Sequence, residues 1–108
     1  MLLEALAREA ECRVSEFNAQ ALANMVWVFG KMNLLDKMLF AAIAREAKRR
    51  VSEFDAQALA NTAWAFGKMG LLDVELFAAI AKEAEWRMNE FNAQSLANTA
   101  WAFAKMNL

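Results

Sequence analysis

The sequence of 108 residues contains no proline, no histidine and no tyrosine, and it has only three glycines and one cysteine. A single cysteine without histidine can form neither an internal disulfide nor a structural zinc site, which excludes disulfide-stabilised secreted scaffolds and zinc-binding domains. Valine, isoleucine and threonine together number nine, too few for an ordinary β-domain. Alanine alone supplies 24 residues. This composition predicts an all-α protein.

Long apolar runs and a basic surplus are also missing. No apolar run reaches the roughly 18 residues that a membrane span requires, so we expect no span. Twelve Lys and Arg against thirteen Asp and Glu leave a formal net charge of -1, whereas freestanding nucleic-acid-binding domains usually carry a basic surplus. The first residues, with Glu4 and Glu9, resemble neither a signal peptide nor a transit peptide. If the protein works in an organelle, we expect its targeting signal to lie outside this chain.

A repeat of 37 residues runs through the whole sequence. Phe17, Phe54 and Phe91 mark its period, and the 37 residues from the first phenylalanine match those from the second at 25 positions. A fixed period of this size is typical of a solenoid, whose units bury their apolar faces only by stacking on one another. We predict one right-handed α-solenoid of six helices, without a linker or second domain. Its three helical hairpins are expected at about 1–35, 36–72 and 73–108.

Each unit is expected to form two helices. In the middle unit, Phe40, Ile43 and Ala47 recur at helical spacing within a helix predicted over residues 37–51, and Asp36 precedes it as an N-cap. The expected N-caps of the second helices are Asn18, Asp55 and Asn92, and their expected left-handed C-caps are Asn33, Gly70 and Asn107.

One face of each second helix carries the same four side chains. At 100° per residue, Gln20, Asn24, Trp27 and Lys31 fall within about 60° of one another, opposite the expected core. The equivalent residues are Gln57, Asn61, Trp64 and Lys68 in the second unit, and Gln94, Asn98, Trp101 and Lys105 in the third. In stacked units these residues would form four parallel ladders along one surface.

The ladders have two interpretations. Amides can bond base edges or sugar hydroxyls, an indole can stack on a base and lysine can contact phosphate, which together suit single-stranded RNA. Alternatively, the tryptophans pack between units and the asparagines form a buried hydrogen-bonded ladder. The candidate RNA-binding residues are Gln20, Asn24, Lys31, Gln57, Asn61, Trp64, Lys68, Gln94, Asn98 and Lys105.

The second helices read LANMVWVFGKMN, LANTAWAFGKMG and LANTAWAFAKMN. This pattern resembles the L-A-N-x-x-W-A-x-A-K-x-G signature of octotricopeptide repeats and of the related 37-residue heptatricopeptide repeats. The resemblance covers the whole chain and implies an α-solenoid that binds single-stranded RNA in a mitochondrion or plastid. It also implies a role in RNA processing, stability, translation or ribosome assembly. The mild acidity and the presence of only three units depart from that family.

Other positions are weaker candidates for contacts. The varying sets Arg8/Arg45/Lys82 and Cys12/Arg49/Trp86 could carry a base code or simply face solvent, and the run Lys48-Arg49-Arg50 could contact phosphate or be solvated. Glu46 and Arg50, four residues apart, suggest a surface ion pair. Without histidine, tyrosine or a glycine-rich loop, we predict no catalytic residue, metal, cofactor or small-molecule substrate.

The ends of the predicted solenoid lack the polar residues that usually cap such arrays. The first helix carries Leu2, Leu3 and Leu6, and the last unit ends in an almost unchanged copy of the interior pattern, including Trp101 and Phe103. We therefore expect both ends to pack against other protein, either more of the same array or a partner subunit. This gives a second functional hypothesis, a structural solenoid within a larger organellar complex.

Overall fold

The computed structural model describes residues 1–108 and contains six α-helices and no strand. The α-helices are α1 (Leu2–Cys12), α2 (Ala19–Lys31), α3 (Lys37–Arg49), α4 (Ala56–Lys68), α5 (Val74–Trp86) and α6 (Ala93–Lys105). Three short 3-10 helices, η1 (Val14–Glu16), η2 (Val51–Glu53) and η3 (Met88–Glu90), join the two helices of each unit. The predicted all-α fold, with six helices arranged in three pairs, is confirmed.

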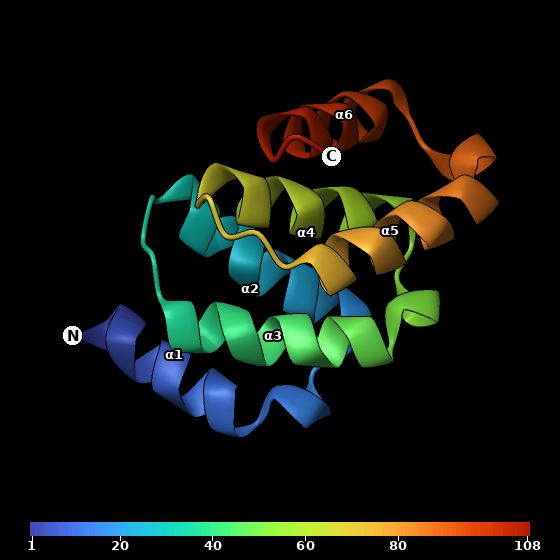
Figure 1. Cartoon of the computed structure of the whole chain (residues 1–108). Coiled ribbons are helices and arrows are strands. Elements are labelled where there is room, and N and C mark those ends of the chain that lie inside the picture. Colours follow the sequence, from blue (N-terminus) through green and yellow to red (C-terminus); the bar gives the residue numbers. More distant parts are fainter.

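The helices form two rows (Figure 1). The second helices α2, α4 and α6 lie side by side in one row, with α4 in contact with both neighbours, and α1, α3 and α5 form the other row. The first and third units share no extensive contact, and the molecule measures 39 × 25 × 22 Å. The units are therefore stacked in an open array rather than closed into a bundle.

The predicted helix caps are confirmed. The side chain of Asn18 accepts a hydrogen bond from the Ala21 N–H at 2.8 Å, and Asp36, Asp55 and Asn92 cap their helices in the same way. The three expected C-cap residues are Asn33, Gly70 and Asn107, with φ of 57°, 68° and 62°. At Asn33 and Gly70, the left-handed residue turns the chain sharply, so that the next helix returns antiparallel.

The first helix of each unit ends earlier than the apolar spacing predicts. In the middle unit α3 stops at Arg49, and Val51 belongs to η2 rather than to the α-helix. Arg50 leaves helical geometry at φ −123° and ψ 25°, and Phe54 is extended so that Asp55 can begin α4. The short 3-10 turn keeps Val51 half-buried while it redirects the chain.

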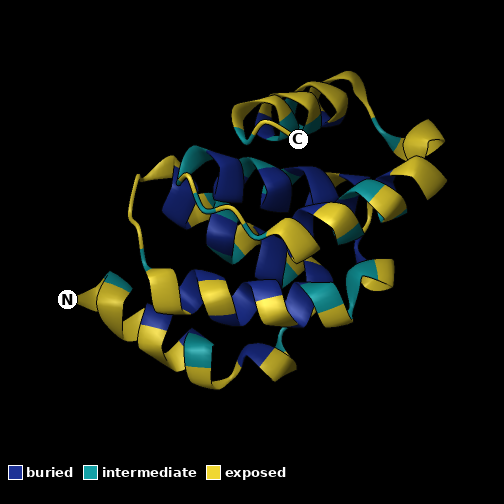
Figure 2. Ribbon diagram, viewed as in Figure 1, coloured by how far each residue is buried: buried dark blue, intermediate teal, exposed yellow.

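The core lies between the two rows (Figure 2). Leu22, Val26 and Phe29 of α2, which lie opposite the ladder face where the core is expected, are all buried. Helix α4 is buried over most of its surface because α2 and α6 cover two of its sides, whereas α1 and α6 at the ends of the array are more exposed. No helix has the length and apolar character needed to cross a bilayer.

Glycines allow the second helices to approach closely. A Cβ placed on Gly30 of α2 would lie 3.3 Å from Trp64 Cζ3 and 3.4 Å from the Ala65 Cα of α4. A Cβ on Gly67 of α4 would lie 3.2 Å from the Ala102 Cα of α6. These contacts are tight enough that a side chain would push the helices apart. The close spacing brings the ladder residues of successive units together.

Candidate nucleic-acid interface

The amides of the ladder line a groove that runs across the three second helices. Its volume is about 280 Å³, and it lies between the amide-bearing turns of α2, α4 and α6. The lining residues are Asn24, Trp27, Gln57, Asn61, Asn92, Gln94, Ser95 and Asn98. Gln20 lines an adjoining shallow hollow together with Asn24, Gln57 and Asn61. The structure thus brings all six predicted amides to one surface.

The amides of this surface are free to bind. The three glutamines and Asn24 are exposed, and Asn61 and Asn98 are half-buried. None of the six side chains is hydrogen-bonded to the protein, and no buried polar side-chain atom lacks a partner, so their N–H and C=O groups face solvent. The asparagines therefore do not form a buried hydrogen-bonded ladder. Each unit presents an unused donor and acceptor toward the groove.

The tryptophans pack against one another beside the amides. The ring centroids of Trp27 and Trp64 are 6.5 Å apart with an interplanar angle of 41°, and those of Trp64 and Trp101 are 6.3 Å apart at 35°. Trp64 is half-buried and approaches the backbone of Gly30 in the preceding unit. The structure therefore gives the central tryptophan a packing contact between units.

Each lysine of the ladder covers the tryptophan of its own helix. Lys31, Lys68 and Lys105 place their Nζ atoms 5.5, 5.4 and 5.2 Å from the ring centroids, in cation–π geometry. Lys68 Nζ also donates to the Gly30 carbonyl at 3.3 Å, and Lys105 Nζ donates to the Gly67 carbonyl at 3.4 Å. These two lysines bind carbonyls at the C-terminal end of the second helix in the preceding unit, and so link neighbouring units.

The whole chain, residues 1–108, matches the family model described as RNA-editing substrate-binding complex 6 protein. The chain belongs to this family. No curated protein matches the chain. The RNA-editing substrate-binding complex is a mitochondrial assembly of kinetoplastids, so the predicted organellar, RNA-related role is confirmed at the level of the family.

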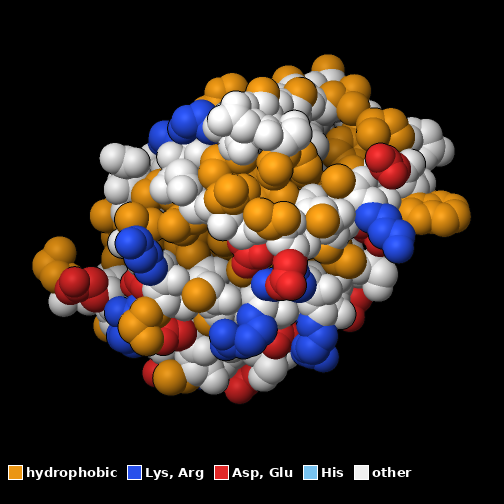
Figure 3. All heavy atoms as spheres, viewed as in Figure 1, with side chains coloured by type: hydrophobic (Ala, Val, Ile, Leu, Met, Phe, Trp, Pro, Cys, Tyr) orange, Lys and Arg blue, Asp and Glu red, His pale blue; other side chains and the backbone are white.

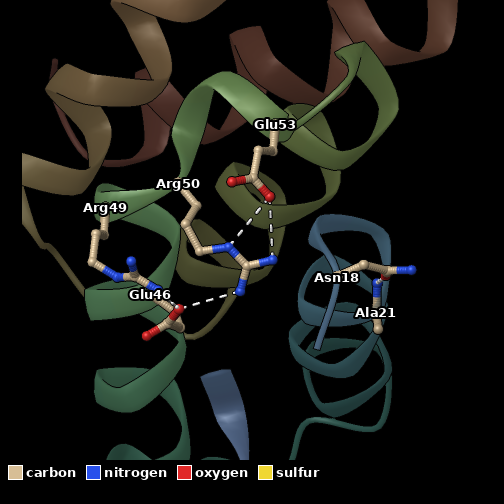
Figure 4. Close-up of polar contacts among 6 residues, drawn as sticks. All are labelled: Asn18, Ala21, Glu46, Arg49, Arg50 and Glu53. Carbon is tan, nitrogen blue, oxygen red and sulfur yellow. Dashed lines mark hydrogen bonds and ion pairs between the residues drawn. The ribbon is translucent and has the colours of Figure 1, made fainter. Parts of the chain in front are cut away.

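The basic side chains of the run Lys48-Arg49-Arg50 in the middle unit form ion pairs with acidic side chains. This pairing affects how an RNA-editing complex protein could contact phosphate. Arg49 reaches Glu46 at 2.6 Å, and Arg50 lies between Glu46 and Glu53 at 3.2 and 3.3 Å (Figure 4). The hydrogen bond from Arg49 lowers the pKa of Glu46, and Arg50 reinforces this against the effect of burial. The predicted ion pair of Glu46 with Arg50 is thus confirmed, but it is largely buried rather than at the surface.

Ion pairs also join successive units, and sequence reasoning missed them. Arg8 of α1 binds Asp36 at the start of α3 with two contacts of 2.8 and 2.7 Å, and Lys48 of α3 reaches Asp73 at the start of α5 at 3.2 Å. The recurrence of Asp36 and Asp73 at the repeat spacing was the available signal. Acidic and basic side chains are accordingly mixed over the face in Figure 3.

The remaining varying positions stay at the surface. Arg45 and Lys82 are exposed and form no ion pair, and Cys12 is an exposed free thiol. Trp86, which occupies in the third unit the position of Cys12 and Arg49 in the first two, is 80% exposed. No group of three or more potential ligand side chains lies close enough together to hold a metal ion. The groove of the second helices is the one surface where polar side chains of all three units converge.

Proposed function

We propose that this chain is a non-catalytic, RNA-binding segment of the mitochondrial RNA-editing substrate-binding complex, built from octotricopeptide- or heptatricopeptide-type repeats. The observation that carries this proposal is the groove with six free amides at equivalent positions of three units. Family membership supports an RNA-related role and favours the mitochondrion over the plastid. Single-stranded RNA fits the groove because its unpaired bases expose edges that amides can hydrogen-bond.

The charges of the site set the expected mode of binding. No lysine or arginine lines the groove, and of the three ladder lysines Lys68 and Lys105 are hydrogen-bonded within the protein. Three phosphate contacts would give a salt dependence with a slope of at most about −2 on logarithmic axes. Affinity is therefore expected to come mainly from hydrogen bonds to bases and sugars rather than from counterion release.

The proposal is tested by replacing the two amides of the central unit. Gln57→Ala with Asn61→Ala removes hydrogen-bonding groups that have no partner in the protein, so the fold should be unaffected. At about 1 kcal/mol for each lost hydrogen bond, we expect the affinity for a fluorescent single-stranded RNA to fall about tenfold or more. Fluorescence anisotropy measures the affinity, and circular dichroism verifies the fold.

Matched controls come from outside the row of second helices. Arg45→Ala removes an exposed cation that forms no ion pair, and Asn89→Ala removes an exposed amide of η3. Both controls should retain the RNA affinity of the unmodified chain. RNA binding that survives the double substitution but is lost on Arg45→Ala would place the interface on the first helices and refute the groove.

A comparison of equivalent residues in the three units favours a second candidate function, the docking of protein at both ends of the array. Leu22 and Leu59 are fully buried, whereas Leu96, the same residue in the last unit, is 44% exposed. Ala100 is likewise exposed where Ala63 is fully buried. The last unit therefore presents an interior surface without a cover. We propose that this surface packs against a further hairpin of the same type, in this protein or in a partner subunit.

A further inference from the structure

The Gln–Asn pairs of the groove are uniform from one unit to the next, and this limits what they can discriminate. Gln20, Gln57 and Gln94 are identical, as are Asn24, Asn61 and Asn98, and each pair occupies the same two turns of its helix. Helical-repeat proteins that read one base per unit use different side chains to select different bases. Here each unit offers the same donor and acceptor at the same place.

The other ladder residues do not add selectivity. A base stacked between two indoles would need rings that are parallel to it, whereas neighbouring tryptophans are tilted by 41° and 35° and already contact one another. The lysines cover the indoles, Lys68 and Lys105 also bind backbone carbonyls, and all three are identical. Of the other polar lining residues, Asn92 caps α6 and Ser95 is buried, so base selection depends mainly on the Gln–Asn pairs.

We propose that the groove recognises a tract of single-stranded RNA in which one base recurs at successive positions. This inference rests on the proposed RNA-binding function. A primary amide presents an N–H donor beside a C=O acceptor, which complements a base edge with an adjacent acceptor and donor. Whichever base satisfies the Gln–Asn pair of one unit satisfies it in all three. A base that fits one unit poorly is penalised at every step.

Uniformity also predicts that the RNA can shift along the groove. Because α2, α4 and α6 are equivalent, a tract displaced by one nucleotide finds the same set of partners. A long uniform tract therefore has many equivalent registers, and its apparent affinity rises with the number of registers. A mixed sequence loses contacts in every register.

The experiment compares labelled RNAs of about 12 nucleotides, made of adenine, of uracil or of cytosine alone, with alternating sequences of the same bases. We expect at least one uniform RNA to bind about tenfold more tightly than every alternating RNA that contains its base. A single foreign base placed at the centre of that tract should weaken binding to the unmodified chain when the tract is only just long enough for one register.

The double variant Gln57→Ala/Asn61→Ala supplies the second arm. This variant has lost the reading side chains of the central unit, so it should bind the centrally interrupted short tract as well as the uninterrupted one. If alternating and uniform RNAs bind the unmodified chain within about twofold, the tract proposal is wrong while RNA binding stands. If no RNA binds, the proposed function fails, and the tract proposal fails with it.

Discussion

Trp64 is the residue for which the two functional interpretations of the ladder predict different roles, packing between units or stacking on a base. It is half-buried, contacts the tryptophans of both neighbouring units and approaches Gly30 of the preceding helix. These contacts make the residue part of the frame between units.

We expect Trp64→Ala to lower the free energy of unfolding by about 2–4 kcal/mol, somewhat less than for a fully buried tryptophan because one edge is exposed. RNA affinity should fall only as far as the folded fraction does. Chemical denaturation monitored by circular dichroism gives the first quantity, and anisotropy gives the second. Unchanged stability combined with lost RNA binding would instead assign Trp64 to base stacking.

Asp36 combines two roles, as the N-cap of α3 and as the partner of Arg8 in the first unit. Burial tends to raise the pKa of Asp36, but the hydrogen bonds from the Leu39 N–H and from Arg8 outweigh it and hold the pKa below the ordinary 3.8. Because the folded pKa is lowered, the stabilisation is complete above pH 3.8. It is lost as the pH falls below that value.

Asp36→Asn keeps a good cap and removes the charge. We therefore expect the variant to melt a few degrees below the unmodified chain near neutral pH, with a difference that shrinks as the pH drops below 3.8. Thermal melting between about pH 7 and pH 2 measures this. Asn18 already caps α2 as an uncharged residue and serves as the structural comparison. A difference that stays constant with pH would show that the ion pair with Arg8 contributes nothing.

Sequence spacing predicted which residues share a face, but not what each residue contacts. The Gln–Asn–Trp–Lys face and the caps follow from local geometry, because they depend on residues within one or two turns. Arg8–Asp36 and Lys68–Gly30 link residues 28 and 38 positions apart. Such contacts depend on how the units rotate against one another, which the repeat period alone does not specify.

At the level of helices, the close packing of α2, α4 and α6 depends on single glycines. Gly67 lies in the last turn of α4, where alanine would still be favoured over glycine by up to about 1 kcal/mol. Its added Cβ would lie 3.2 Å from the Ala102 Cα, however, and the rigid backbone of α6 cannot move without disturbing the stack.

We expect Gly67→Ala to destabilise the chain by about 1–2 kcal/mol, because overpacking outweighs the gain in helix propensity. Ala104→Gly at the equivalent, uncovered position of α6 is the control and should lose only about 0.5–1 kcal/mol through propensity. Denaturant melts of both variants provide the comparison. A stabilised Gly67→Ala chain would mean that α4 and α6 are not closely packed.

At the level of the whole molecule, the two ends of the array are nearly complementary. Ala102 of α6 faces α4. Val28 occupies the equivalent position in α2, where it is exposed at the first end of the array. Ala104 at the other end replaces the glycine found in the two earlier units. Both changes add bulk at the point of closest approach. Head-to-tail contact between two copies should therefore be possible but weaker than the contacts within the chain.

This geometry gives a prediction that separates head-to-tail contact from symmetric pairing. Leu96→Glu disables the last face, and Met25→Glu disables the first, where Met25 lines an open hollow together with Leu6 and Phe17. Neither variant should self-associate, because each head-to-tail contact needs one face of each kind. A mixture of the two retains one intact pair of faces and should form a 1:1 complex that grows no further. Sedimentation equilibrium at high protein concentration measures the masses, and Ala41→Glu, on the exposed side of α3, is the control that should behave like the unmodified chain. Self-association of Met25→Glu alone would show that the last faces pair symmetrically, and monomers in the mixture would show that these ends receive a different protein.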